Sequence, residues 1–257
     1  MIRASGKEST LFMSVVPSTL QSFPYVAGIQ AIKACRQFGT FDSFYQDLIE
    51  NLPQNSPQTR RRFASLIVRW FFPDRNLDGL LPMTWAIYQD EQLLIELMRV
   101  TTLETEPVIA RFVTDVIMPL APGDVFAAAM ARDYIIGVYH EYKKDSYDRL
   151  FVTVRSLGFL SRRGGEWIVN ALSRPANALL LLLHTRLAPT PRIVRIGDLL
   201  EQPFVTYLGF RDAGDVRNVL REAASAALIA RYSIVDQLEQ ITTRYSVDEY
   251  FANQLKL

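Results

Sequence analysis

A short stretch of this sequence carries side chains that suit contacts with a nucleic acid. The guanidinium fork of arginine matches phosphate oxygens in two parallel hydrogen bonds, and serine or threonine hydroxyls reach phosphates and base edges. Lysines nearby add an attraction that acts on any phosphate backbone. The candidate DNA-binding residues are Lys143, Lys144, Arg149, Thr153, Arg155, Ser156, Arg162 and Arg163.

The first half of this stretch has the spacing of one amphipathic helix. Apolar residues recur at helical intervals over residues 146–157, which predicts a helix with one apolar face. Ser146 or Asp145 is the expected N-cap, and Gly158 is the expected stop signal.

Polar side chains occupy the other side of this expected helix. The spacing places Arg149, Thr153 and Ser156 opposite the apolar face, with Arg155 near its edge. The alternative for Arg149 and Arg155 is pairing with acidic residues earlier in the chain.

The second half of the stretch reads as a tight β-hairpin. Residues 159–163 and 166–169 flank Gly164-Gly165, and paired glycines suit a two-residue turn that needs positive φ angles. A helix followed by a hairpin with arginines at its tip is the composition of a winged helix. There the helix enters the major groove and the hairpin touches the phosphate backbone. The alternative is a helix and a hairpin that only pack on each other.

The rest of the chain predicts a mainly α fold. We expect a weakly ordered N-terminus over residues 1–22 and a helical bundle without strands over residues 23–142. A winged-helix-like module with a small β-hairpin follows over residues 143–190. A helical C-terminal subdomain is expected over residues 191–257, and a possible hairpin there would make it a second, degenerate helix–wing unit.

The net charge of +1 conceals a strong segmental pattern. Residues 76–142 hold ten acidic and three basic side chains, whereas residues 143–195 hold ten basic and three acidic ones. The basic segment suits phosphates, and the acidic segment suits another protein or the basic segment itself. A second basic cluster, at Arg60, Arg61 and Arg62, leaves RNA binding by the bundle open as an alternative.

The sequence offers little for catalysis, and we expect neither a cofactor nor a metal. Two histidines and one cysteine, Cys35, exclude metal sites built on several such ligands, and no phosphate-binding glycine loop occurs. Pro73-Asp74 with Glu141 and Lys143 matches a nuclease pattern by letter, but the gap is long and both pieces end expected helices.

Neither export nor membrane insertion is expected. The apolar run over residues 178–183 is far shorter than the roughly 20 residues that span a bilayer. A single cysteine, expected to be buried and inert, suits a reducing compartment, so we expect a cytoplasmic protein.

The order of these features resembles the BrxA family of the BREX bacteriophage-exclusion systems. The matching pieces are residues 51–62 (NLPQNSPQTRRR), residues 111–117 (RFVTDVI) and residues 157–160 (LGFL). The resemblance implies a bundle similar to an RNA-binding antitermination protein, DNA binding and no known catalytic site. The segment after Pro191 is longer here than in typical members.

Together these features predict a non-catalytic, DNA-binding component of a bacterial phage-defence system. The expected partners are double-stranded DNA and other proteins of the defence system. The alternative is a scaffold that docks those proteins without binding DNA itself.

Overall fold

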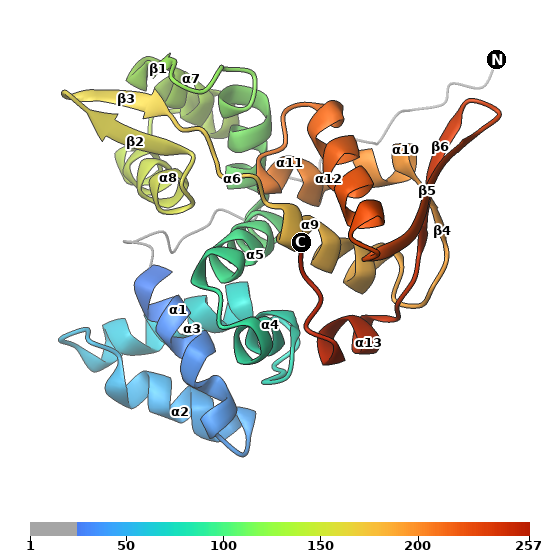
Figure 1. Cartoon of the computed structure of the whole chain (residues 1–257). Helices are drawn as coiled ribbons and strands as arrows, with labels where there is room; N and C mark the ends of the chain where they lie inside the picture. Colours follow the sequence, from blue (N-terminus) through green and yellow to red (C-terminus); the bar gives the residue numbers. More distant parts are fainter. Residues whose placement is uncertain (1–24) are drawn as a thin grey trace, which may run out of the picture.

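The computed structural model describes residues 25–257 as a mainly helical chain with two small antiparallel sheets of three strands each (Figure 1). The expectation for residues 1–22 lies outside the described residues.

The first part of the described chain is a bundle of helices. Side chains cap several of them: Thr40 accepts from the backbone NH of Ser43, Ser56 from that of Thr59, and Asp90 from that of Leu93. The elements are α1 (Tyr25–Ala34), the 3-10 turn η1 (Cys35–Gln37), α2 (Phe41–Asn51), α3 (Pro57–Phe71), α4 (Leu80–Tyr88), α5 (Glu91–Thr105), α6 (Pro107–Phe112) and its π-helical extension η2 (Val113–Ile117).

Helix α4 and helix α5 replace what the apolar spacing predicts as one helix over residues 84–103. Gln89 adopts a left-handed conformation with φ of 48° and ends α4, and Asp90 then caps α5. The sequence has no glycine at this break to indicate it, because Gln89 adopts the left-handed conformation that glycine usually takes.

The bundle is closed by apolar packing and by a few buried polar contacts. Trp70 is fully buried, and its indole Nε1 donates to the Glu106 carboxylate at 2.6 Å. Arg69 pairs with the same carboxylate. The Cys35 thiol is fully buried, as expected, and burial raises its pKa to about 11.

The first sheet closes a unit that starts in the bundle's last helix. After α6 come β1 (Val125–Phe126), α7 (Ala128–Tyr139), α8 (Lys144–Ser156), β2 (Leu160–Arg163) and β3 (Glu166–Val169). Strand β1 pairs with β3, and β3 pairs with β2, all antiparallel. The bundle was expected to contain no strand, but two residues of β1 suffice to pair with β3, and so short a strand shows no alternation.

The second sheet closes a unit with a similar order of elements and one additional helix between its first strand and its hairpin. Its parts are α9 (Ala176–Leu182), the π-helical turn η3 (Leu183–Leu187), β4 (Ile193–Arg195), α10 (Ile196–Leu200), α11 (Pro203–Leu208), α12 (Ala213–Ser225), β5 (Ile229–Val235) and β6 (Leu238–Thr243). Its strand order, β4-β6-β5, repeats the order β1-β3-β2. In both units a strand precedes the helices, and a hairpin follows the last of them. A short helix, α13 (Val247–Ala252), ends the chain.

The structure moves several expected boundaries. Val125 pairs with Ile168, so the boundary expected at residue 142 would separate strands of one sheet. Apolar spacing over residues 215–231 predicts a helix, but α12 ends at Ser225 and β5 starts at Ile229. The possible hairpin of the C-terminal segment is present, formed by β5 and β6.

Candidate nucleic-acid interface

Helix α8 is held by its apolar face and by a well-formed C-terminus. Leu150, Phe151 and Val154 are buried. At the end of the helix, Gly158 NH bonds to the Arg155 carbonyl and Phe159 NH to the Val154 carbonyl, with Gly158 at a φ of 87°. This is a Schellman motif, and it turns the chain directly into β2.

The start of α8 differs from the expectation. The helix begins at Lys144, and neither Asp145 nor Ser146 caps it; Lys143 occupies the N-cap position without a side-chain hydrogen bond. Asp145 lies in the first turn, where a negative charge still favours the helix dipole.

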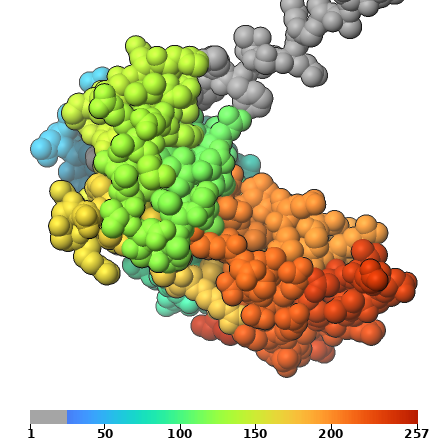
Figure 2. Space-filling view, turned by 90° about the horizontal axis from the view of Figure 1, so that it is seen from above, coloured from blue at the N-terminus to red at the C-terminus, as the bar shows by residue number. Residues whose placement is uncertain are grey.

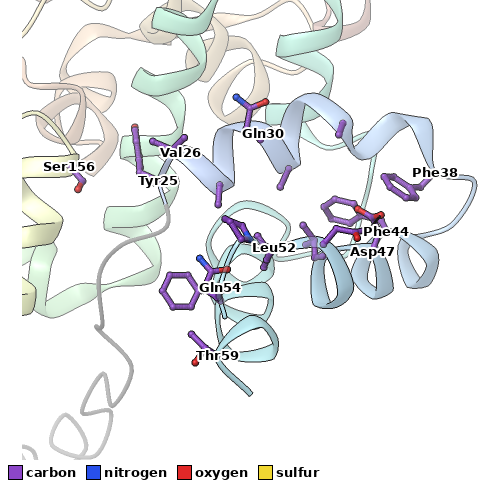
Figure 3. A pocket seen from close by; sticks show the side chains of 17 residues that line it. Tyr25, Val26, Gln30, Phe38, Phe44, Asp47, Leu52, Gln54, Thr59 and Ser156 are labelled. Carbon is purple, nitrogen blue, oxygen red and sulfur yellow. Dashed lines mark hydrogen bonds between the residues drawn. The ribbon is translucent and has the colours of Figure 1, made fainter. Parts of the chain in front are cut away.

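Two of the predicted contact residues on α8 face the protein. Thr153 is only 1 % exposed, because it lies three residues after Leu150 and so shares the buried face. Ser156 is half-buried and lines a recess of the bundle, beside Tyr25 and Val26 (Figure 3). The prediction of DNA contact is therefore wrong for Thr153.

The exposed stripe of α8 contains Lys144, Asp148 and Arg155. Lys144 pairs with Asp148 one turn later, and Lys143 pairs with Glu141 at 3.0 Å. Exposed pairs of this kind contribute little to stability, so a phosphate can replace either carboxylate at small cost. Arg155 is exposed and makes no ion pair within residues 25–257.

Arg149 lies on the flank of α8 toward α7. It is half-buried and close to Tyr139, whose pKa is raised by burial and lowered in part by Ser146, Lys143 and Arg149. Arg149 thus interacts with a tyrosine of α7, and pairing of Arg149 with an acidic residue stays a prediction.

The hairpin has the predicted turn and register. Gly164 and Gly165 have φ angles of 57° and 93°, and Arg162 lies opposite Trp167 in the register. The Arg162 guanidinium lies over the Trp167 ring at 5.9 Å, and its Nε donates to the Gly165 carbonyl at 3.4 Å. Arg163 is exposed on the other face of the hairpin, because neighbouring strand residues point to opposite sides.

The helix and the hairpin share a shallow recess of about 300 Å³. Arg155 lines it from α8 and Trp167 from β3. The other lining residues, all on α8, are Tyr147, Asp148, Phe151 and Val152. Arg155 therefore lines the recess directly, and Arg162 lies over Trp167, the aromatic residue that lines it from the hairpin. The sequence analysis missed Trp167 as a site residue, although the two-glycine turn already sets it opposite Arg162.

The second basic cluster, Arg60 to Arg62, does not act as one surface. Arg60 donates to the backbone carbonyls of Ile49 at 2.9 Å and Gln54 at 3.0 Å, so it ties α2 to α3. Arg61 is exposed and Arg62 half-buried, because consecutive helix residues point in different directions.

The recess beside α1 has a volume of about 780 Å³ and is mainly apolar (Figure 3). Among the described residues that line it, Asp47 is the charged one.

The comparisons with known proteins leave the chain without an assigned family. Neither family models, nor curated proteins, nor solved structures give a match to it. Within residues 25–257, no group of three His, Cys, Asp or Glu side chains is placed to hold a metal ion. In the same range, no helix combines the length and the apolar character needed to cross a membrane.

Proposed function

We propose that α6 to β3 form a winged helix that binds double-stranded DNA and acts by binding rather than by catalysis. The observation that supports the proposal is the recess between α8 and the hairpin, which Arg155 and Trp167 line, with Arg162 lying over Trp167. Exposed arginines over an aromatic wall suit phosphate oxygens and sugar edges. The surplus of basic residues over positions 143–195 adds a longer-range attraction.

The proposed setting is a bacterial phage-defence system of the BREX type, in the cytoplasm, with other subunits of that system as partners. This part of the proposal rests on the resemblance to the BrxA family in the sequence. DNA binding by the recess does not depend on it.

The decisive experiment is fluorescence anisotropy of a labelled random-sequence duplex, titrated with the protein from low to physiological salt. We expect micromolar or tighter binding at low salt and a log–log salt slope of several units, since each phosphate contact contributes about 0.9. Reversal of both hairpin charges (Arg162→Glu with Arg163→Glu) should weaken binding at least about tenfold and flatten the slope by about 2.

The matched control reverses two exposed arginines at the far side of the molecule. Arg192 and Arg195 lie at β4, which Figure 1 places away from β2 and β3. Arg192→Glu with Arg195→Glu changes the net charge equally and should leave most of the binding intact. If both double variants lose the same DNA affinity, the loss is explained by net charge alone. If the hairpin variant binds DNA as the wild type does, the hairpin is not part of the interface.

A scaffold role is the second candidate, and the tip of the β5–β6 hairpin favours it. Ile234, Val235 and Leu238 are 63, 47 and 54 % exposed, which is unusual for large apolar side chains so close together. Replacement of Val235 and Leu238 by Ser should abolish co-elution with a purified subunit of the same system while leaving DNA affinity unchanged. Retained co-elution would count against this surface.

A further inference from the structure

Helix α12 occupies in the second unit the place that α8 occupies in the first. Each is the last helix before a hairpin, and each hairpin belongs to a three-stranded sheet of the same order. The C-terminus of α12 repeats the Schellman motif of α8, since Ala227 NH bonds to the Ala224 carbonyl and Leu228 NH to the Ala223 carbonyl. The two units thus share the strand order of the sheet and the turn between the last helix and the hairpin, although the second unit has one more helix.

The outer side of α12 is polar and exposed within the described part of the chain. Val216, Val219, Leu220 and Ala223 are fully buried, so the opposite side faces solvent. The exposed residues at three- and four-residue spacing on that side are Asp215, Asn218, Arg221, Glu222 and Ser225. Asp215 lies in the first turn of the helix, so Asn218, Arg221 and Ser225 form the uncharged and basic part of this stripe.

Arg221 is held in place before any ligand arrives. Its guanidinium lies over the Tyr232 ring at 5.2 Å and donates to the Asn218 side-chain oxygen at 3.2 Å. The Tyr232 hydroxyl donates to Glu239 at 3.0 Å, and Arg217 holds the same carboxylate at 2.6 Å. Because β5, β6 and α12 all contribute, the arginine needs little further ordering to bind.

Charges around the stripe leave Arg221 available to an acceptor. Glu222, its neighbour, is engaged by Arg174 at 2.9 Å, and Glu239 is engaged by Arg217. Arginine reads the O6 and N7 acceptors of guanine, and asparagine reads the N6 and N7 groups of adenine in the major groove. An adjacent, exposed arginine–asparagine pair on one helix therefore suits base edges better than phosphates alone.

We propose that α12 is a second DNA-contacting helix, which enters the major groove and presents Arg221 and Asn218 to base edges. The inference rests on the proposed function, because it assumes that the first unit holds the same duplex. The hairpins then differ in role: Arg162 and Arg163 flank the first turn, whereas the second turn consists of Asp236 and Gln237 and offers phosphates no cation.

The test compares sequence selection with affinity. A pool of random duplexes is bound to the protein, and the recovered sequences are read for the wild type and for each variant. We expect Arg221→Ala and Asn218→Ala to lose base preference at one or two positions. Arg221→Ala should also weaken binding by about fivefold or more, the loss that one base-reading pair carries.

The matched control is Arg195→Ala. Arg195 is an exposed arginine of the same unit, on the face of the sheet away from α12, because its neighbour Val194 points into the core. It should retain the base preference and bind within about twofold of the wild type. A gain variant, Ser225→Lys, adds a cation one turn further along the stripe and should steepen the salt slope by up to about 1.

The outcomes separate the two proposals. If Arg221→Ala and Asn218→Ala behave like Arg195→Ala while the Arg162 and Arg163 double variant loses binding, α12 is not a DNA helix and the first unit still is. If all variants bind equally, both proposals fall. If single-stranded RNA displaces the duplex at lower concentration than unlabelled duplex does, the stripe serves RNA and the inference is overturned.

Discussion

Arg99 shows how one buried side chain connects separate parts of this molecule. It lies on α5, is 3 % exposed, and donates to the backbone carbonyl of Leu157 at 2.8 Å and to that of Leu208 at 3.2 Å. Leu157 ends α8 and Leu208 ends α11, so the guanidinium joins the bundle to both units. Burial lowers the pKa of Arg99, while Tyr25 and Glu96 nearby favour its charged form.

Loss of this guanidinium should destabilise the whole chain. Arg99→Met fills similar volume but leaves two buried carbonyls without donors, and each costs about 1–3 kcal/mol. We expect a decrease in the free energy of unfolding of about 3 kcal/mol, measured by urea denaturation. Arg99→Lys should recover only part of it, because one ammonium lacks the fork that spans both carbonyls. A decrease below about 1 kcal/mol in Arg99→Met would contradict this role.

His184 makes stability depend on pH. It is fully buried, its ring lies 4.4 Å from that of Tyr250, and burial lowers its pKa from 6.5 to about 4. Between these values the unfolded chain binds the proton more tightly, so stability falls as the pH drops below 6.5. Through His184, the free energy of unfolding should be about 2 kcal/mol lower at pH 5 than at pH 8.

The measurement is urea denaturation at both pH values. His184→Phe keeps a ring of similar size and should remove this part of the pH dependence. His140→Asn alters the other, exposed histidine and should leave the dependence in place. If the free energy of unfolding of His184→Phe still falls between pH 8 and pH 5 as in the wild type, the pH dependence comes from other groups.

At the scale of elements, the two Schellman motifs form a natural pair for comparison. Gly158 supplies the left-handed residue after α8, whereas Ala227, with φ of 58°, supplies it after α12. Alanine is strained in this region and glycine is not. We expect Ala227→Gly to stabilise the protein by up to about 1 kcal/mol and Gly158→Ala to destabilise it by about 1 kcal/mol or more, in thermal unfolding followed by circular dichroism.

The space around Gly158 allows the two substitutions to test backbone strain without a steric clash. A Cβ there would lie 3.5 Å from Arg99 and from Leu172, which is ordinary contact, so the cost of Gly158→Ala comes from the backbone angle. A destabilising Ala227→Gly would mean that the lost methyl group or the greater freedom of the unfolded chain outweighs the relieved strain.

The elements that the sequence predicted best are those announced by glycine or by a cap. Gly164-Gly165 specified the first hairpin, and Ser56-Pro57 specified the start of α3. The end of α12 was missed because Ala226 and Ala227 favour a helix by their type, and tertiary structure imposes the turn. Thr153 was misplaced because its polarity was given more weight than its position on the buried face.

At the scale of the whole molecule, one order of elements occurs twice, and Figure 2 shows the two units as neighbouring lobes, in green to yellow and in orange to red. The sequence hinted at the second unit through its hairpin. It did not reveal that the first unit begins before residue 142, because pairing between β1 and β3 is a long-range contact of two residues.

Two DNA-contacting helices on one chain predict a dependence on duplex length. A duplex of about 10 base pairs offers roughly one turn of groove and one unit's site, whereas about 30 base pairs offer room for both units. The second contact then becomes intramolecular, so anisotropy should give at least about tenfold tighter binding to the longer duplex after correction for the number of sites. Arg221→Ala should abolish most of this gain, and a gain unaffected by it would place the second contact elsewhere.

Because both units are attached to Arg99, the two DNA-contacting helices of the proposed complex meet the duplex at a fixed spacing. Because α8 and α11 end on the same guanidinium, the spacing between the DNA-contacting helices is set by the bundle rather than by a flexible tether. The DNA helix repeats about every 10.5 base pairs, so two half-sites shifted by half a turn would face opposite sides of the duplex. The protein would then measure distance along DNA as a rigid calliper, and insertion of about five base pairs between half-sites would disrupt binding more than insertion of a full turn.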